Sequence, residues 1–203
     1  MDKKEFREEC KKLLNKKNRY IYHKKIENQL FKELSKKQYK NILIYISMGN
    51  EVNTKQLINR LKQKNKQIFV PFMEYLSFKM VKFSLPLKKK KFNIYEPKNK
   101  NRTKQKIDIA VVPIIGMDKN FKRVGFGKGM YDRFFDKLKY KPKIVFTQLY
   151  PCTIDKNVTD EYDIKANLFV SYNLVCKRRT NGYRDCSKFR TISNSRFFPS
   201  KKD

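Results

Sequence analysis

The chain has 203 residues, a length that suits one α/β domain, and a hydrophobic content of 39%, which is enough for a core. Its N-terminus lacks the apolar run of a signal peptide and no stretch is long enough to span a membrane, so we expect a cytoplasmic protein. The net charge of +31 has two explanations: a polyanionic partner such as nucleic acid, or an A+T-rich genome whose codons favour lysine. Because the lysines are spread along the chain, genome composition is the favoured explanation.

Helix-like and strand-like segments alternate along most of the chain. Apolar residues recur at three- and four-residue steps over 2–38 with a break near 15–20, over 53–65, where Asn53 or Thr54 can cap a helix, and over 130–140. Apolar or alternating runs predict strands at 41–48, 67–73, 77–84, 107–115, 143–150 and 163–171. This order predicts a single α/β domain of three layers (α/β/α), Rossmann-like, with a mostly parallel sheet.

Two segments do not fit this alternation. Residues 88–106 form a polar connection in which Pro97 disfavours regular structure. From residue 177 to 203 the periodicity is lost, and nine basic residues accompany only two acidic ones. We therefore assign 1–176 to the α/β domain and predict that 177–203 form a disordered basic tail.

The cysteines and the sole histidine give no sign of a metal site or a nucleophilic active site. Cys10, Cys152, Cys176 and Cys186 lie far apart and include no CxxC pair, so we expect reduced thiols and neither a zinc site nor a disulfide framework. His23 lies in a helical segment with no predicted partner, and we expect it at the surface. No Ser-His-Asp or Cys-His system can be built without it.

Three of the six glycines, Gly125, Gly127 and Gly129, lie in the sequence RVGFGKGMYDRFF, which begins at Arg123. This segment follows a predicted buried strand and precedes a predicted helix, at the sheet edge where α/β proteins bind ligands. Glycines there let backbone N–H groups approach an anion, and the helix N-terminus adds partial positive charge. We predict a phosphate-binding loop. A tight turn with solvated basic residues is the alternative.

Charged side chains strengthen the phosphate-loop prediction. Arg123 and Lys128 supply full positive charges within the loop, and Asp132 lies one turn into the following helix, where it can hold a magnesium ion against the same phosphates. The loop matches neither the Walker A motif nor the dinucleotide fingerprint.

With its upstream residues, the loop resembles the signature of the 5-formyltetrahydrofolate cyclo-ligase family, also called 5,10-methenyltetrahydrofolate synthetases. The family pattern is an apolar strand ending in Val-Pro, an Asp, a short turn and R-x-G-x-G-x-G-Y-Y-D. The matching positions here are Val112, Pro113, Asp118, Arg123, Gly125, Gly127, Gly129, Tyr131 and Asp132. Asn120 stands at the usual turn glycine, an exchange that we expect to be tolerated because Asn readily adopts the left-handed conformation.

Further motifs follow in the family's order, and the resemblance extends from residue 3 to about 173. They place Lys3 and Arg7 in KKEFREECKK, Tyr45, Glu51 and Thr54 in YISMGNEVNTKQLI, Glu96 and Pro97 in FNIYEP, and Asp163 in DEYDIKANLFVS. The chain departs from the pattern at Ile114, Met130, Tyr162 and Asn167.

The resemblance implies an enzyme that uses ATP and Mg²⁺ to convert 5-formyltetrahydrofolate to 5,10-methenyltetrahydrofolate through an N-iminophosphate, with ADP and phosphate as products. It implies that ATP is bound by Lys3, Arg7, Arg123, Gly125, Gly127, Lys128, Gly129, Tyr131 and Asp132. Within this set Arg123 and Lys128 are the catalytic residues and Asp132 is the metal ligand. It implies a folate pocket formed by Tyr45, Met48, Glu51 and Tyr131.

We expect a monomer with no membrane partner and with nucleic acid unlikely to be its main partner. The alternative function is a non-enzymatic basic protein that binds RNA or another polyanion. The charge supports this alternative, but the sequence has no RNP-type aromatic motif, KH loop or zinc knuckle.

Overall fold

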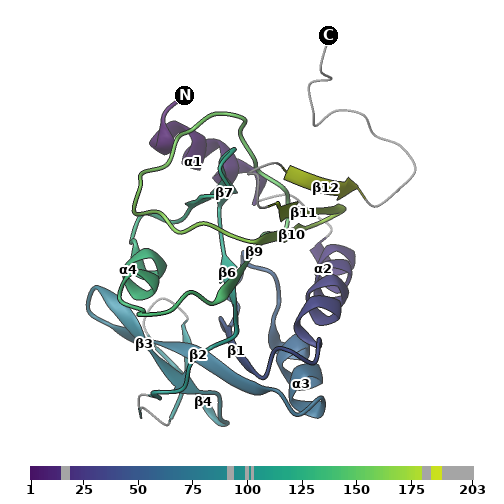
Figure 1. Cartoon of the computed structure of the whole chain (residues 1–203), viewed down its shortest axis with the longest axis vertical. Helices are drawn as coiled ribbons and strands as arrows, with labels where there is room; N and C mark the ends of the chain where they lie inside the picture. The colour runs from purple at the N-terminus through teal and green to yellow at the C-terminus, as the bar shows by residue number, and fades with distance from the viewer. Residues whose placement is uncertain (15–18, 91–93, 99–100, 102, 180–183, 189–203) are drawn as a thin grey trace.

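The computed structural model describes residues 1–14, 19–90, 94–98, 101, 103–179 and 184–188. Its centre is an eight-stranded sheet in the order β12-β11-β10-β9-β6-β1-β2-β3 (Figure 1). The strands are β1 (Asn41–Ile44), β2 (Gln67–Glu74), β3 (Ser77–Lys82), β6 (Ile109–Pro113), β9 (Lys143–Thr147), β10 (Leu168–Ser171), β11 (Leu174–Arg178) and β12 (Arg184–Lys188). Each of the six predicted strands is present, most of them shorter than predicted.

The middle of the sheet is parallel and its edges are antiparallel. Strands β2, β1, β6, β9 and β10 run parallel to one another, as expected where helices or long loops connect successive strands. The hairpin partner β3 closes one edge, and β11 and β12 close the other edge in antiparallel pairing. The predicted α/β class with a mostly parallel sheet is confirmed.

Helices cover both faces of the sheet (Figure 1). Successive side chains of a strand point to opposite faces, and β1 shows the result: Ile42 and Ile44 join one core cluster and Leu43 the other. Helices α2 (Arg19–Leu34) and α3 (Lys55–Gln63) pack on the first cluster, and α4 (Met130–Asp136) packs through Phe134 on the second.

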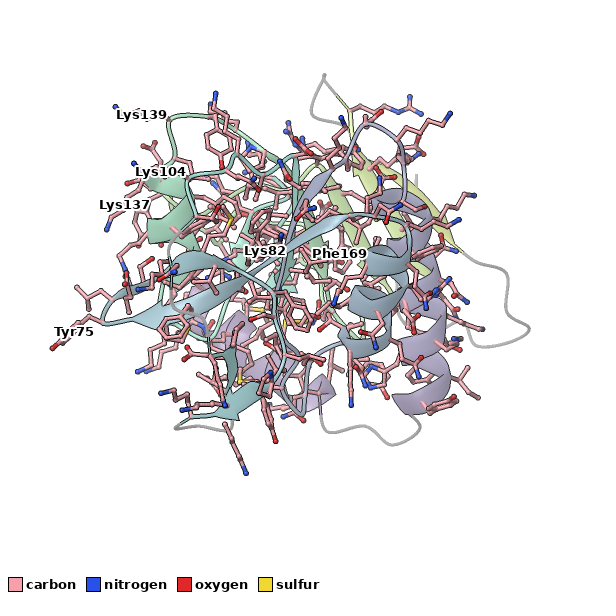
Figure 2. All side chains as sticks on the ribbon, turned by 90° about the horizontal axis from the view of Figure 1, so that it is seen from below. Tyr75, Lys82, Lys104, Lys137, Lys139 and Phe169 are labelled. Carbon is pink, nitrogen blue, oxygen red and sulfur yellow. A yellow bond between two sulfur atoms is a disulfide. The ribbon has the colours of Figure 1, made fainter. Side chains whose placement is uncertain are left out.

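Figure 2 shows the side chains of the described residues on the ribbon, both those of the core and those at the surface. Phe169 of β10 lies inside with no exposed surface, whereas Tyr75 projects from the tip of the β2–β3 hairpin. Lys104, Lys137 and Lys139 project outward from other parts of the chain. None of the helices in the described parts of the chain is long and apolar enough to cross a bilayer.

The first helix, α1 (Lys3–Leu13), is fixed at its start by a capping box. The side chain of Asp2 accepts a hydrogen bond from Glu5 N, and the Glu5 side chain accepts one from Asp2 N. Phe6 on the buried face packs with Ile115 and Val124, at the small hairpin of β7 (Gly116–Met117) and β8 (Arg123–Val124). This packing brings the N-terminal helix beside the glycine loop.

The prediction of reduced, unpaired cysteines is wrong. Cys10 on α1 is joined to Cys152 in the loop after β9, and Cys176 of β11 is joined to Cys186 of β12. The first pair is separated by 142 residues, so no local spacing could indicate it. The second pair occupies directly opposite positions of an antiparallel ladder that the sequence did not predict.

The predicted tail is structured in part. Arg184–Lys188 form strand β12, and β11 extends to Arg178, so seven residues of the predicted tail belong to the sheet. Residues 180–183 and 189–203 of the tail lie outside the described residues. The domain boundary at 176 stays a prediction, but loss of apolar periodicity did not mean loss of strand structure, because an edge strand with polar residues is still hydrogen-bonded on one side.

Three local predictions also need correction. Pro97 ends a short strand, β5 (Tyr95–Pro97), which pairs with β4 (Leu87–Lys89) inside the predicted irregular connection. The left-handed turn position is Phe121, with φ of 60°, and not Asn120. His23 is half-buried, and its Nδ1 accepts a hydrogen bond from Asn53 N.

Candidate active site

A pocket opens at the carboxyl ends of the neighbouring strands β1 and β6. From β1 the chain continues to one side of the sheet, and from β6 it continues to the other side. Strand β1 continues to β2 on one side and pairs with β6 on the other, and such a switch point is where α/β sheets bind ligands. The pocket has about 830 Å³ of empty space, part of which is open to solvent, and its lining is mostly apolar. Its lining residues are Tyr45, Ile46, Met48, Glu51, Pro71, Met73, Phe78, Ile94, Tyr95, Pro113, Arg123, Gly125, Phe126, Lys128, Gly129, Met130 and Tyr131.

The glycine loop forms one wall of this pocket, and its glycines serve two physical purposes. Gly127 and Gly129 have φ of 95° and 57°, a conformation that other residues adopt only with strain. At Gly125 a Cβ would lie 2.9 Å from Nη2 of Arg123, and at Gly129 it would lie 2.9 Å from Nη1 of Arg133. Two of the three glycines therefore make room for guanidinium groups.

Arg123 and Asp132 form a buried ion pair at the base of the loop. Arg123 Nε lies 3.1 Å from Asp132 Oδ1, and Nη2 lies 2.9 Å from Oδ2, so the contact uses two parallel hydrogen bonds. Arg123 is 5% exposed and Asp132 is 7% exposed. Asp132 Oδ1 also accepts a hydrogen bond from Ile164 N. The predicted phosphate ligand and the predicted metal ligand are thus partners of each other.

Asp132 does not fit the role of a direct magnesium ligand in this arrangement. Its carboxylate already accepts three N–H groups, and the guanidinium cation of Arg123 contacts both of its oxygens, which disfavours a dication at the same carboxylate. Mg²⁺ also requires near-octahedral geometry and keeps several waters, for which a buried carboxylate leaves little space. Over the described residues no group of three Asp, Glu, His or Cys side chains could hold a metal ion.

Helix α1 brings Arg7 to the glycine loop and Lys3 to the loop after β9. Arg7 Nε donates a hydrogen bond of 2.7 Å to Gly125 O. Lys3 Nζ lies 2.7 Å from Asp160 Oδ2 and 2.5 Å from Asp163 Oδ2. Burial alone lowers the pKa of Lys3, but the bonds to Asp160 and Asp163 outweigh it and raise that pKa, so the ammonium group stays charged.

Tyr45, Glu51 and Tyr131 meet on the apolar side of the pocket. Tyr45 O–H donates to Val52 O, and the backbone O of Tyr45 accepts a hydrogen bond from Thr54 Oγ1. Burial raises the pKa of Glu51 to about 7, against the lowering effect of the hydrogen bond from Met48 N. Burial first, and the nearby Glu51 carboxylate second, raise the pKa values of both tyrosines.

The structure brings most of the predicted site residues into one region. Tyr45, Met48, Glu51, Arg123, Gly125, Lys128, Gly129 and Tyr131 line the pocket, whereas Lys3, Arg7, Gly127 and Asp132 do not. Arg7 and Asp132 are held next to it, by Gly125 and Arg123. Lys3 is paired with Asp160 and Asp163 instead.

Sequence reasoning missed several residues of the site. Phe126, Met73, Phe78 and Tyr95 line the pocket but were treated as loop or strand residues. Arg133 was also missed: its guanidinium donates to the backbone O of Lys128 and of Leu76, and so joins the glycine loop to the β2–β3 turn. The one feature of the sequence that could have indicated this role is the position of Arg133, directly after Asp132 and one helical turn from the glycine loop.

Comparison with known proteins decides the family. The model of the 5-formyltetrahydrofolate cyclo-ligase family matches residues 1–164, which is most of the chain. The chain belongs to the 5-formyltetrahydrofolate cyclo-ligase family. The suspected resemblance is confirmed, and the chain is a member of a family of enzymes, the ATP-using cyclo-ligases.

Curated relatives support this membership. The 5-formyltetrahydrofolate cyclo-ligase of Haemophilus influenzae is 31% identical over 140 residues, which are 64% of this chain and 75% of that protein. The cyclo-ligase of Mus musculus is 26% identical over 155 residues, which are 67% of this chain and 76% of that protein. The cyclo-ligase family therefore indicates a 5,10-methenyltetrahydrofolate synthetase activity, with a folate and ATP as family substrates.

Solved structures share the cyclo-ligase fold. The 5,10-methenyltetrahydrofolate synthetase of Aquifex aeolicus superposes with a TM-score of 0.72 at 21% identity, covering 96% of this chain and 97% of that chain. The synthetase of Mycoplasma pneumoniae superposes with a TM-score of 0.63 at 21% identity, covering 84% and 98%. At these identities the likeness establishes the fold.

Proposed function

We propose that this chain converts 5-formyltetrahydrofolate to 5,10-methenyltetrahydrofolate, with hydrolysis of ATP to ADP and phosphate. One observation carries the proposal: a single pocket combines an apolar, aromatic floor, suited to a flat ring system, with a glycine loop that bears Lys128. A folate ring and a triphosphate require these two kinds of surface side by side.

The proposed chemistry has two steps. The formyl oxygen on N5 attacks the γ-phosphorus, the bond to the β-phosphate oxygen breaks, and ADP leaves; the product is an N-iminophosphate. N10 then attacks the activated carbon and loses its proton, and inorganic phosphate leaves as the methenyl bridge closes. The protein must hold the formyl oxygen near the γ-phosphate and neutralise the charge that moves during transfer.

The proposed roles follow from where the side chains lie. Lys128 is exposed at the pocket wall and can reach a phosphate, and the buried Arg123 lines the same pocket. Loop N–H groups at Gly125, Gly127 and Gly129 are proposed to bind phosphate oxygens. Arg7 supports the loop through Gly125 O, and Lys3 supports α1, so both act on ATP through the loop rather than by direct contact.

The folate is proposed to occupy the apolar side of the pocket. Tyr131 and Tyr45 offer ring surfaces, and Met48 lies at the exposed rim. Glu51, whose pKa is near neutral, can hydrogen-bond the pterin as acid or as carboxylate. Magnesium is proposed to arrive with ATP, held mainly by phosphate oxygens and water.

The absorbance of the methenyl product gives a direct test. Purified protein with 5-formyltetrahydrofolate, ATP and Mg²⁺ should form the methenyl chromophore, and omission of ATP should abolish it. Lys128→Ala should lower kcat about 30- to 1,000-fold, as expected for loss of one charge-assisted transition-state contact. Lys139→Ala, an exposed lysine outside the pocket, is the matched control. Folded protein that forms no chromophore would refute the proposal.

The working form is proposed to be a cytoplasmic monomer; the pocket lining described above comes from residues of one chain. A non-enzymatic polyanion-binding role is disfavoured, since membership of an enzyme family accounts for the pocket and for the glycine loop.

A further inference from the structure

The ion pair between Arg123 and Asp132 lies under the glycine loop and is almost completely buried. Two hydrogen bonds, of 3.1 and 2.9 Å, join the guanidinium to the carboxylate, and Ile164 N donates a third bond to Oδ1. A carboxylate in this position has no freedom to turn toward another ligand. Its contacts fix the orientation of Arg123 instead.

One further contact and one space determine where the same guanidinium group lies. Its Cζ lies 5.2 Å from the centre of the Tyr131 ring, and the absence of a side chain at Gly125 leaves space for Nη2. Two of the five N–H groups of Arg123 are used by Asp132, and Arg123 remains part of the pocket lining. Among the described residues no other hydrogen-bond acceptor pairs with the remaining N–H groups of Arg123.

We propose that Asp132 is a positioning residue: it orients Arg123 toward the transferred phosphoryl group and does not ligate magnesium. The inference rests on the proposed function, because it assigns Arg123 to phosphoryl transfer. It explains why an acidic side chain that would repel ATP is placed beside a phosphate loop: the carboxylate is shielded by its cation. It also explains the Arg-x-Gly spacing, since Gly125 leaves the space that the fixed guanidinium needs.

A positioning role and a metal-ligand role for Asp132 predict different results for Asp132→Asn. Asparagine keeps the size of the side chain but loses its charge and one acceptor oxygen, so the bidentate contact is lost and Arg123 becomes free to reorient. The pocket also gains one net positive charge, so ATP should bind at least as well as before. A misaligned guanidinium should nevertheless lower kcat about 100-fold, because transition-state contacts depend on orientation. Loss of a metal ligand would instead raise the magnesium requirement.

The experiment measures kcat, KM for ATP, and the ratio of ATP Kd values without and with Mg²⁺, for the wild type, Asp132→Asn and the control Asp136→Asn. Asp136 is exposed on the same helix. We expect Asp132→Asn to lose about 100-fold in kcat while KM and the Kd ratio change less than about 3-fold. A Kd ratio that falls tenfold or more would identify a metal ligand and overturn the proposal. An unchanged kcat would overturn it as well.

A second variant covers the case in which Asp132→Asn fails to fold. Arg123→Lys keeps the buried charge but cannot form the two parallel bonds, so it should show the same split between kcat and KM. A wild-type kcat for this variant would contradict the positioning role. If the wild type binds ATP but forms no chromophore, the proposed function fails, and the Kd ratio still decides whether Asp132 ligates magnesium.

Discussion

The ammonium group of Lys3 lies 2.5 Å from Asp163 Oδ2, so residues 160 positions apart form an ion pair. Asp163 also accepts a hydrogen bond from Asp160 N, and Asp160 forms a second ion pair with Lys3. The start of α1 is thereby attached to the loop that follows β9. Since α1 also carries Arg7, which holds Gly125 O, this attachment supports the glycine loop from a distance.

Asp163→Asn should destabilise the protein more than Asp160→Asn. The Asp163 side chain is 6% exposed and that of Asp160 is 49% exposed. Water can therefore replace the carboxylate of Asp160 as a partner of Lys3 more easily than the buried carboxylate of Asp163. The free energy of unfolding should fall by about 1.5–3 kcal/mol for Asp163→Asn and by less than about 1 kcal/mol for Asp160→Asn. Urea unfolding of both variants measures the difference. Equal decreases in the free energy of unfolding would show that the Lys3–Asp163 pair stabilises the protein no more than the Lys3–Asp160 pair.

Arg123→Ala should unfold far more easily than Lys128→Ala, although both residues are cations of the same loop. Removing Arg123 leaves Asp132 as a buried unpaired charge, which costs about 3–5 kcal/mol. Lys128 is exposed, so its loss should change stability by less than about 0.5 kcal/mol. Denaturant midpoints at neutral pH test this. An Arg123→Ala variant as stable as Lys128→Ala would mean that the ion pair does not form.

Much of the fold could be predicted from the sequence because apolar periodicity reports burial directly. The buried strand at Ile109–Pro113 and the helix after Gly129 were both found in this way. The family motifs also located the pocket, because the carboxyl ends of parallel strands meet at one edge. What periodicity could not indicate was a structured segment without apolar alternation, and β12 is the example.

The pairing of side chains could not be predicted from the sequence in the same way. The sequence suggested that Arg123 and Asp132 each bind a ligand, and their contact with each other depends on the path of the chain between β8 and α4. The Cys10–Cys152 contact likewise depends on how α1 packs over β7. Long-range contacts of this kind depend on tertiary packing, and the spacing of residues within a short segment of sequence does not indicate them.

Glu51 should make stability fall as the pH rises toward neutral. Its pKa is raised from 4.5 to about 7 in the folded protein, so the folded state binds this proton more tightly than the unfolded state does. The resulting stabilisation is fully present below pH 4.5 and is lost as the pH rises through about 7. Glu51→Gln cannot ionise, so its stability should depend less on pH between 5 and 8.

Urea unfolding at pH 5, 6, 7 and 8 gives this dependence for the wild type and for Glu51→Gln. The exposed Glu161 provides the control variant Glu161→Gln, which should keep the wild-type dependence. Parallel curves for the wild type and Glu51→Gln would show that Glu51 is not the group responsible.

Thiol titration of the unfolded protein should detect no free cysteine before reduction and four after it, because all four cysteines are paired in the structure. Reduction should lower the free energy of unfolding by about 2–5 kcal/mol, mainly through Cys10–Cys152, which closes the longer loop. Cys10→Ala measures that contribution separately from Cys176→Ala. Four free thiols in protein purified without reductant would contradict both pairings.

Truncation after Cys176 should leave cyclisation intact while lowering stability. The removed part includes β12 and the end of β11, at the edge of the sheet opposite to β3. The pocket lining lies on β2, β3, β5, β6, β8 and α4 and on the loops after β1 and β8 and before β5. The thermal midpoint should fall by several degrees, about the effect of losing 1–2 kcal/mol in a domain of this size. A truncated protein that folds but loses most of its turnover would contradict the prediction.

Strand β12 also bears on how the protein behaves at high concentration. It is the last strand of the sheet among the described residues, so one of its edges faces no described strand, and its sequence RDCSK contains three charged residues among five. Charged edge strands discourage the growth of a sheet from one molecule into the next. Without β12 the outer strand would be β11, in which Leu174 and Cys176 are buried at present, and the chain would then expose an apolar edge that favours aggregation.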